Sequence, residues 1–522
     1  MVPASLQEVA ASGAAELVSE LDGAPALRIG RDGLSRMAVV DLGSNSVRLV
    51  VFQGRGRNPL GIVNEKAVIR LGRGLESSGR LDADTMAQAM TVMHRYQAIV
   101  AAMGASPFEV LATSAVRDAE NGREFVARLA ARMQGVRIRI LSGEEEAALS
   151  AEGVLCGIPA ADGVLADVGG GSLELVRLDH GRAAEAATLR LGVIRLAERA
   201  RGDIVRARTT VDGDLAGVSW LAQGAGRDLY LVGGTFRALA RIHIAQTSYP
   251  LAMVHHYTLG RDEARDLTGV IAAASQRALE RLPGAPRRRL EDLPYAAVTL
   301  RRLLRVTAAA RVVFSANGVR EGWFMRHVPE SVRAEDPLLA AAKEFGERLG
   351  RDPRLAPALI AWTEPLFPGE SAEAVRLREA ACWMSDIGSR DHPEYRAEQT
   401  FLRVLRQPGI GLDHHARAFL ALVLALRYEA DRGASFLAPV RSLLDMAAAN
   451  RAEALGIALR LAYTLSAGTP ALLAGTALSL EGSRLVLRLS ECTGVFAGEG
   501  VVRRLDRLAQ VLGREAVTDA VR

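Results

Sequence analysis

Two stretches of the chain repeat one pattern, and this repeat is the feature that most constrains the fold. Residues 37–52 (MAVVDLGSNSVRLVVF) and 163–178 (GVLADVGGGSLELVRL) both read as an apolar run, Asp, an apolar residue, Gly, two small residues, Ser, two further residues and Leu-Val. Each copy predicts a β-hairpin, because a β-branched strand meets a tight glycine turn and then an alternating strand. Two copies of one hairpin predict a duplicated α/β domain with two facing lobes.

A third glycine turn follows the two hairpins. Residues 228–242 (DLYLVGGTFRALARI) pass from a strand pattern through a Gly-Gly-Thr turn into a helical pattern. Free backbone N–H groups at the start of a helix attract anions, so a turn of this kind can bind phosphate. A glycine turn often only reverses the chain, but its place after two Asp-Gly hairpins favours a phosphate site here.

The chain is long enough for several domains. Its 522 residues predict three or four domains, and from about residue 335 the pattern becomes helical and rich in Ala and Leu. Polar residues and a proline interrupt the pattern at residues 328–336, and a late hairpin pattern (TALSLEGSRLVLRLSE) follows near the C-terminus. We predict an N-terminal extension over residues 1–36, a first lobe over 37–160, a second lobe over 161–330 and a helical domain over 331–522.

Composition narrows the cellular setting. Three widely spaced cysteines argue against a disulfide framework or a zinc site, and no apolar run reaches the roughly 20 residues that a membrane span needs. Residues 1–36 lack the basic start and apolar core of a signal peptide, so we expect a cytoplasmic protein. Lys66 and Lys343 are the only lysines, and residue usage across a whole proteome is the ordinary explanation of this bias. Arginine also suits bidentate contacts with phosphate, so an anionic substrate is compatible with it.

Five motifs in one order carry a resemblance to a known family. The motifs are DLGSNS, ATSAVRDA, ILSGEEEA, DVGGGSLEL and LVGGTFRALA. Over residues 37–330 the chain resembles the Ppx/GppA phosphatases, which are exopolyphosphatases and guanosine pentaphosphate phosphohydrolases. The resemblance implies duplicated actin-like (ribonuclease H-like) lobes of the actin–sugar kinase–Hsp70 (ASKHA) fold and a homodimer. It also implies hydrolysis of a terminal phosphoanhydride bond by water.

The acids around the second glycine turn suggest a metal site. Two carboxylates flanking a phosphate would repel it unless a cation lay between them, and Mg²⁺ is commonly held by carboxylates, waters and substrate phosphates together. The resemblance implies that Asp167 and Glu174 bind Mg²⁺ and that Asp41 is a further acid near the metal. A glutamate on a solvated strand face and an aspartate that closes its own turn are the structural alternatives.

Two further residues are candidates for the chemistry. Ser142 and Glu145 fit a helix capping box, which leaves Glu146, the last acid of the motif, as the catalytic base that the resemblance implies. The positive end of the helix should favour an ionised Glu146 carboxylate. By the same resemblance, Arg117 is directed at a substrate phosphate. An ordinary first-turn glutamate and a surface arginine are the alternatives.

The glycine turns supply the expected phosphate-binding groups. Glycine lets a backbone approach phosphate closely, and hydroxyl and amide side chains add donors. In the first hairpin, Arg48 stands where the second has Glu174. The expected phosphate-binding residues are Gly43, Ser44, Asn45, Ser46, Gly169, Gly170, Gly171, Ser172, Gly233, Gly234 and Thr235.

The C-terminal region resembles an HD phosphohydrolase domain that has lost its metal ligands. Residues 380–405 align with the core helices, but Ser385-Asp386 stands in place of His-Asp, and Tyr395–Glu398 supplies no histidine. Loss of imidazole groups removes good ligands for divalent metals. We interpret this region as a catalytically inactive helical domain that forms a dimer or lines a channel for a long anion, with a solvated helix surface as the alternative.

Three classes of function are compatible with these patterns. The leading hypothesis is a Mg²⁺-dependent exopolyphosphatase that removes terminal orthophosphate from inorganic polyphosphate, with hydrolysis of pppGpp to ppGpp as the alternative. A sugar or acid kinase of the same superfold would need an acceptor-binding motif, and none is evident. A non-catalytic sensor of alarmone nucleotides would not need the intact acids.

Overall fold

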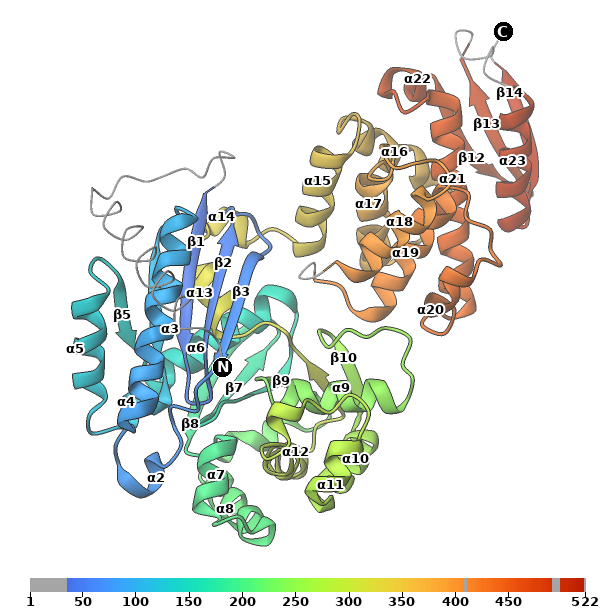
Figure 1. Ribbon diagram of the computed structural model, residues 1–522. Coiled ribbons are helices and arrows are strands. Elements are labelled where there is room, and N and C mark those ends of the chain that lie inside the picture. Colours follow the sequence, from blue (N-terminus) through green and yellow to red (C-terminus); the bar gives the residue numbers. More distant parts are fainter. Residues whose placement is uncertain (1–34, 408–410, 491–497, 521–522) are drawn as a thin grey trace, which may run out of the picture. The chain divides into compact units, whose positions relative to one another are not determined.

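The computed structural model describes residues 35–407, 411–490 and 498–520, and these divide into two compact units (Figure 1). The first unit runs to Gln246 and resumes over Thr258–Glu330. The second unit contains Thr247–Tyr257 and the chain from Ser331 onward. The extension expected over residues 1–36 lies outside the described residues except for its last two.

Two mixed sheets organise the first unit. The five-stranded sheet has the order β3-β2-β1-β4-β5, and the six-stranded sheet has the order β10-β11-β9-β6-β7-β8. The strands are β1 (Arg36–Leu42), β2 (Ser46–Gln53), β3 (Leu60–Val68), β4 (Phe108–Ala112), β5 (Arg137–Ile140), β6 (Gly163–Val168), β7 (Leu173–Asp179), β8 (Arg182–Leu189), β9 (Asp228–Val232), β10 (Tyr257–Gly260) and β11 (Arg311–Phe314).

The two sheets share one topology. In each, a central strand (β1 or β6) pairs antiparallel with the second strand of its hairpin and parallel with the strand after the next helical segment (β4 or β9). Asp41 pairs directly with Arg48 in the first hairpin, and Asp167 pairs directly with Glu174 in the second. The predicted duplication of an α/β lobe is therefore confirmed down to the register of its hairpins.

Helices pack around these sheets. They are α2 (Leu75–Ser78), α3 (Ala83–Ala102), α4 (Ser114–Asp118), α5 (Gly122–Arg132), α6 (Gly143–Gly157), α7 (Val193–Arg199), α8 (Ile204–Ala216), α9 (Phe236–Gln246), α10 (Arg261–Ala273), α11 (Gln276–Arg281), α12 (Leu293–Thr307) and α13 (Val319–Arg326), with short 3₁₀ turns at Ser219–Gly224 and Arg287–Arg289. Helix α14 (Glu330–Arg333) begins at the last residue of the first unit and continues into the second.

Helix α6 differs from the sequence-based division at residue 160. Its Ala147 and Ala151 share a core with Leu165 and Val176 of the second sheet, so α6 packs with the lobe that follows it in sequence. An apolar helix face is buried by whichever sheet lies beside it, and sequence order alone does not decide which sheet that is.

The second unit is mostly helical and ends in a small sheet. Its apolar core includes Leu251 from the segment Thr247–Tyr257, which the sequence-based division places in the second lobe. The elements are α15 (Pro337–Leu349), α16 (Leu355–Thr363), α17 (Ala372–Met384), α18 (Arg396–Arg406), α19 (His414–Arg427), α20 (Ala438–Arg441), α21 (Met446–Ser466), α22 (Pro470–Ala474), β12 (Thr476–Glu481), β13 (Arg484–Leu489), α23 (Glu499–Val511) and β14 (Glu515–Ala520), with 3₁₀ turns at Glu364–Leu366 and Ser435–Leu437.

The late hairpin is present as β12 and β13, and β14 adds to it in parallel. Two α/β lobes followed by a mostly helical unit confirm the predicted fold class. Within the described ranges, no helix is long and apolar enough to cross a membrane.

Candidate active site

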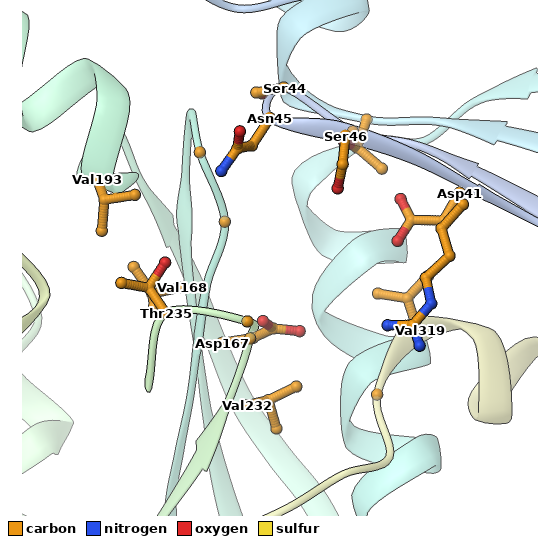
Figure 2. A pocket seen from close by; sticks show the side chains of 18 of the residues that line it. Asp41, Ser44, Asn45, Ser46, Asp167, Val168, Val193, Val232, Thr235 and Val319 are labelled. Atoms are coloured by element: carbon orange, nitrogen blue, oxygen red, sulfur yellow. The ribbon is translucent and has the colours of Figure 1, made fainter. Parts of the chain in front are cut away.

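A cleft of about 370 Å³ lies between the two glycine hairpins of the first unit. The β1–β2 and β6–β7 turns, the β9–α9 turn and the first turns of α6 and α13 contribute to its lining. Figure 2 shows the carboxylates of Asp41 and Asp167 pointing into this space from their separate strands. Most of the expected site residues are thus brought together: Asp41, Gly43, Ser44, Asn45, Ser46, Glu146, Asp167, Gly169, Gly170, Glu174, Gly233, Gly234 and Thr235.

The first two glycine turns are built alike. The Gly43 amide donates to the Ser46 carbonyl at 3.2 Å, and the Gly169 amide donates to the Ser172 carbonyl at 3.0 Å. Amides at the start of α7 also donate to the carbonyls of Gly169 (3.1 Å) and Gly170 (2.9 Å). These bonds occupy the carbonyl side of the second turn, so its remaining amides are the groups available to an anion.

Three acids crowd the second hairpin. Asp167 and Glu174 are direct cross-strand partners, and the Ser150 hydroxyl donates to Asp167 Oδ2 at 2.6 Å. Glu174 is 2% exposed, and its Oε1 has no hydrogen-bond partner among the described residues. Glu146, from the first turn of α6, lines the same cleft. A buried carboxylate oxygen without a donor needs a ligand, and a cation would satisfy it.

Burial dominates the protonation of these acids. It raises the pKa of Glu146 to about 7, against the lowering effect of Arg117. It also raises the pKa of Glu174 well above its usual value, with the nearby Glu146 and Asp167 adding to the effect. The pKa values of Asp41 and Asp167 are raised by burial in the same way. A bound cation would reverse this tendency and hold the carboxylates ionised.

The first hairpin carries cations where the second carries acids. Arg48 pairs with Asp41 on one side and with Lys66 of β3 on the other, so Asp41, Arg48 and Lys66 form a row on one face of the sheet. The equivalent row on the second sheet is Asp167, Glu174 and Thr188. We call these the cationic row and the acidic row.

Two positive charges, those of Arg48 and Lys66, lie next to each other in the cationic row. Directly opposed like charges on neighbouring strands are destabilising without a counter-ion. Burial, then Arg320, lowers the pKa of Arg48 to about 10. Partial burial, then neighbouring arginines led by Arg289, lowers the pKa of Lys66 to about 8. An anion bound here would relieve the repulsion.

Sequence reasoning missed most of the cations in the cleft. Arg48 was recognisable as the counterpart of Glu174, and Lys66 as one of two lysines, but their pairing depends on the β2–β3 register. The cleft-lining cations are Arg48, Lys66, Arg237, Arg241, Arg289 and Arg320. Among these, burial lowers the pKa of Arg237 to about 9.

The third glycine turn is covered by an arginine from a distant part of the chain. Arg289 Nη1 donates to Thr235 Oγ1 at 2.8 Å, and a Cβ on Gly234 would lie 2.3 Å from Arg289 Nη2. A side chain at position 234 would therefore displace the guanidinium from its present place. A cation beside the N-terminus of α9 adds to the positive field of this turn.

Three expected residues lie just outside the lining of the cleft. Arg117 sits behind Glu146: its Nη1 donates to Glu146 Oε2 at 2.9 Å and to the Leu141 carbonyl at 3.0 Å. Gly171 packs against the hydroxyls of Ser44 and Ser114. Ser172 borders a different hollow, described below. In this structure Arg117 is paired with Glu146, and a contact of Arg117 with a substrate phosphate stays a prediction.

The expected capping box of α6 is present. Ser142 Oγ accepts from the Glu145 amide at 3.1 Å, and Glu145 Oε2 accepts from the Ser142 amide at 2.9 Å. This leaves Glu146 as the acid of the first helical turn that faces the cleft.

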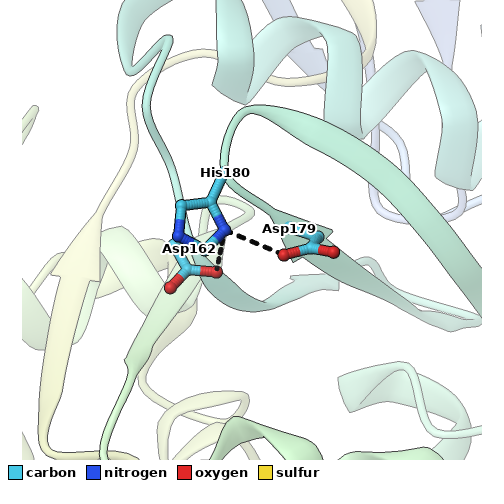
Figure 3. Close-up of side chains that lie close together, drawn as sticks. All are labelled: Asp162, Asp179 and His180. Atoms are coloured by element: carbon cyan, nitrogen blue, oxygen red, sulfur yellow. Dashed lines mark hydrogen bonds and ion pairs between the residues drawn. The ribbon is translucent and has the colours of Figure 1, made fainter.

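Another acidic cluster lies at the far end of β7 from the cleft (Figure 3). Asp162, Asp179 and His180 bring three potential ligand atoms within 4.8 Å of one another. Arg227 Nη1 already approaches Asp162 at 2.8 Å and Asp179 at 3.8 Å. Arg177 also approaches Asp179 at 3.5 Å, so guanidinium groups already pair with both acids of this partly exposed cluster, and none of its residues lines the cleft.

In the second unit, the position expected for a metal-binding aspartate holds an ion pair. Asp386 accepts from Arg351 Nε at 3.0 Å and from Nη2 at 2.9 Å, and Ser385 Oγ lies 2.9 Å from the Tyr463 hydroxyl. The Arg427 guanidinium stacks over the Tyr463 ring at 3.7 Å. Fixed guanidinium groups thus occupy the surroundings of Asp386.

Comparisons with known proteins agree with this geometry. Residues 50–331 match the Ppx/GppA phosphatase family, and residues 338–518 match the exopolyphosphatase C-terminal family. Exopolyphosphatase 1 of Mycobacterium tuberculosis is 29% identical over 303 residues, covering 56% of this chain and 88% of that protein. Exopolyphosphatase 2 of the same organism is 30% identical over 255 residues, covering 45% and 79%. The crystal structure of an exopolyphosphatase from Cytophaga hutchinsonii superposes with a TM-score of 0.52 at 22% identity, covering 56% of this chain and 99% of that one.

Two α/β lobes of one topology that share a charged cleft define an actin-like fold. Within that class, the chain belongs to the Ppx/GppA phosphatase family. Members of this family are hydrolases of phosphoanhydride bonds and depend on divalent metals.

Proposed function

We propose that the protein is an exopolyphosphatase that releases terminal orthophosphate from inorganic polyphosphate. The observation that carries this proposal is the pair of equivalent rows facing one cleft, one acidic and one cationic. A chain of phosphates can place its terminal group at the acidic row, together with a metal ion, and its following groups at the cationic row. A single terminal phosphate would not need Arg48 and Lys66 of the cationic row.

We further propose Mg²⁺ as the metal. The donor set is made of carboxylate oxygens, which Mg²⁺ prefers, and Glu174 Oε1 is buried without a donor. Asp167 and Glu174 would hold the ion, with Asp41 as a further acid near it. When bound, the metal neutralises phosphate charge and so favours phosphoryl transfer.

The protein's own groups define the remaining chemistry. A water oxygen forms a bond to the terminal phosphorus, the bridging P–O bond breaks, and its electron pair stays on the shortened chain. Glu146 takes the proton of the water; a carboxyl with a pKa near 7 suits a general base at neutral pH. Arg117 holds Glu146 in place, and the backbone amides of the glycine turns hold the transferring phosphate.

The lining of the cleft favours polyphosphate over pppGpp. Its described lining is charged or polar apart from glycines and four valines, and it contains no aromatic ring to stack on a guanine base. The alternative substrate has one observation in its favour. A hollow of about 420 Å³, lined by Tyr295 and Ile194 among others, includes Asp292, which accepts a hydrogen bond from Asn45 of the first turn at 3.3 Å. A nucleoside could lie there while its triphosphate entered the cleft.

The experiment compares phosphate release from long polyphosphate and from pppGpp, each with and without Mg²⁺. We expect release that requires Mg²⁺ and is faster from polyphosphate. A strong preference for pppGpp would reverse the order of the two substrates. Release that required a hydroxyl acceptor would indicate a kinase, and tight ppGpp binding without turnover would indicate a sensor. The homodimer stays a prediction of the resemblance, and the cytoplasmic location stays a prediction of the sequence composition.

A further inference from the structure

A second hollow lies behind the wall of the active-site cleft. We call it the rear pocket; it has a volume of about 740 Å³ and opens to solvent beside the exposed Arg190. Arg117, Ser172 and Thr188 are among its lining residues. Glu146 lines the cleft and is bonded to Arg117, which lines the rear pocket, so a single layer of side chains separates the two spaces.

The acidic row runs from the cleft toward the rear pocket. Asp167, Glu174 and Thr188 are successive cross-strand partners on β6, β7 and β8. Neighbouring strands lie about 4.8 Å apart, so Thr188 is roughly 10 Å from Asp167 across the sheet. Helix α6 begins directly over this end of the row, because a Cβ on Gly143 would lie 2.5 Å from Thr188 Oγ1. The rear pocket therefore begins about one phosphate diameter beyond the acids.

The chemistry of the rear pocket suits an anion that passes through it. The Ser172 hydroxyl borders the pocket, is 2% exposed and lies close enough to the Glu174 carboxylate to lower the pKa of Glu174. The cations of the pocket are already paired: Arg195 Nη1 with Asp118 Oδ2 at 2.6 Å, and Arg190 Nη2 with Glu76 Oε2 at 2.9 Å. With Glu144 also lining the pocket, these pairs leave little net positive charge there, so orthophosphate would not be held tightly.

We propose that the rear pocket is the exit for the orthophosphate product. This proposal rests on the proposed exopolyphosphatase function. Each cleavage leaves orthophosphate at the acidic row, the innermost position, while the remaining chain still occupies the cationic row in front of it. If the enzyme keeps its polymer between cleavages, the product cannot leave by the way the polymer entered. The rear pocket offers a second way out.

The wall can open without a change in the backbone. It consists of the side chains of Arg117, Glu146 and Ser172, and Arg117 is the long and rotatable member. Arg117 Nη1 is bonded on one side to Glu146 and on the other to the Leu141 carbonyl. A swing of this guanidinium away from Glu146, accompanying the phosphate, would connect the two spaces.

The test narrows the rear pocket from its outer edge. Ala186 is exposed on β8, lines the rear pocket and lies on the face of the sheet that carries Thr188. Ala184, two residues earlier on β8, is exposed but is not among the residues lining it, so Ala184→Trp is the matched control. Acid quench measures all orthophosphate that has been cleaved, whether bound or free, and a fluorescent phosphate sensor measures only the orthophosphate released to solution. Both measurements are made on long polyphosphate and on tripolyphosphate.

We expect Ala186→Trp to leave the first cleavage at the wild-type rate but to slow steady-state release on long polyphosphate by at least about threefold, because product release becomes limiting. Acid quench should then show a rapid first phase of cleaved orthophosphate that the phosphate sensor does not detect. On tripolyphosphate the defect should be smaller, because the short product vacates the cleft and opens the front route. Ala184→Trp should match the wild type.

The proposal that the rear pocket is the exit would be wrong if the two tryptophan variants behaved alike and released orthophosphate from long polyphosphate as fast as they cleaved it. An equal slowing of release on long polyphosphate and on tripolyphosphate would also contradict the proposal, because release would then not depend on whether the remaining chain occupies the cleft. Failure of the proposed function is distinct: the wild-type enzyme would release no phosphate from polyphosphate at all.

Discussion

Among single residues, Glu146 is the one whose position most affects the proposed chemistry. Burial raises the pKa of its carboxyl to about 7, and the Arg117 ion pair opposes that rise. The sequence predicted a carboxylate kept ionised by the helix N-terminus, but burial has the larger effect. Its neighbour Glu145 has a different task, since it closes the capping box and accepts from Arg139 Nη2 at 2.6 Å. Of these two adjacent glutamates, Glu145 caps the helix and Glu146 faces the cleft.

We predict that Glu146→Gln slows turnover by about 10²-fold or more with little change in folding, because the amide cannot accept the proton of the attacking water. Steady-state kinetics on polyphosphate, with thermal unfolding as the check on folding, measures this. The control is Glu145→Gln, which should keep turnover and lose at most about 1 kcal/mol of stability. Turnover of Glu146→Gln near that of the control would remove Glu146 from its role.

At the scale of elements, the second glycine turn is held by the start of α7. Gly192 precedes this helix, and a Cβ there would lie 2.3 Å from both Gly170 C and Gly171 N. Gly192 has φ −60° and ψ 148°, a conformation open to any residue, so glycine is required by packing and not by backbone strain. The start of α7 and the second glycine turn are therefore in direct backbone contact.

Replacement of Gly192 by Ala should push the second glycine turn away from α7. We expect the free energy of unfolding to fall by about 1–3 kcal/mol, as for other overpacked sites, and kcat to fall together with affinity for polyphosphate. Denaturant unfolding and kinetics measure the two effects. Gly213→Ala in α8 has open space around it and should be neutral or stabilising by up to about 1 kcal/mol. Equal behaviour of the two variants would contradict the packing argument.

In the molecule as a whole, the chain contributes to the second unit in two separate segments. The segment Thr247–Tyr257 belongs to this unit. Both ring nitrogens of His414, on α19, contact this segment. His414 Nδ1 lies 2.9 Å from the Tyr249 hydroxyl, and Nε2 lies 3.0 Å from the His255 carbonyl. Burial lowers the pKa of His414 to about 4, so it is neutral in the folded protein at neutral pH.

This histidine should make the second unit sensitive to acid. An unfolded chain protonates histidine near pH 6.5, while the folded unit resists protonation until about pH 4, so stability is lost as the pH falls between these values. The loss reaches at most about 3 kcal/mol. Hydrogen exchange of α19 peptides at several pH values, corrected for intrinsic rates, measures it. His414→Gln should be less stable at pH 7 but show a shallower dependence on pH; an unchanged slope would assign the acid sensitivity to other groups.

The sequence determined those parts of the site that depend only on residues close together in the chain. The glycine turns, the capping box and the position of Arg48 opposite Asp41 follow from turn chemistry and from the period of two along a strand. These rules act over a few residues, so one sequence suffices to apply them. For the same reason the duplication of the lobes could be read directly from the two hairpins.

Only the tertiary structure decided what faces these turns. Lys66 meets Arg48 through the register of β2 and β3, Arg289 reaches Gly234 from more than fifty residues away in the chain, and Arg117 turns toward Glu146 instead of the cleft. Each contact joins segments that no local periodicity relates. Their positions are fixed by how buried surfaces pack, and packing is a property of the whole folded chain.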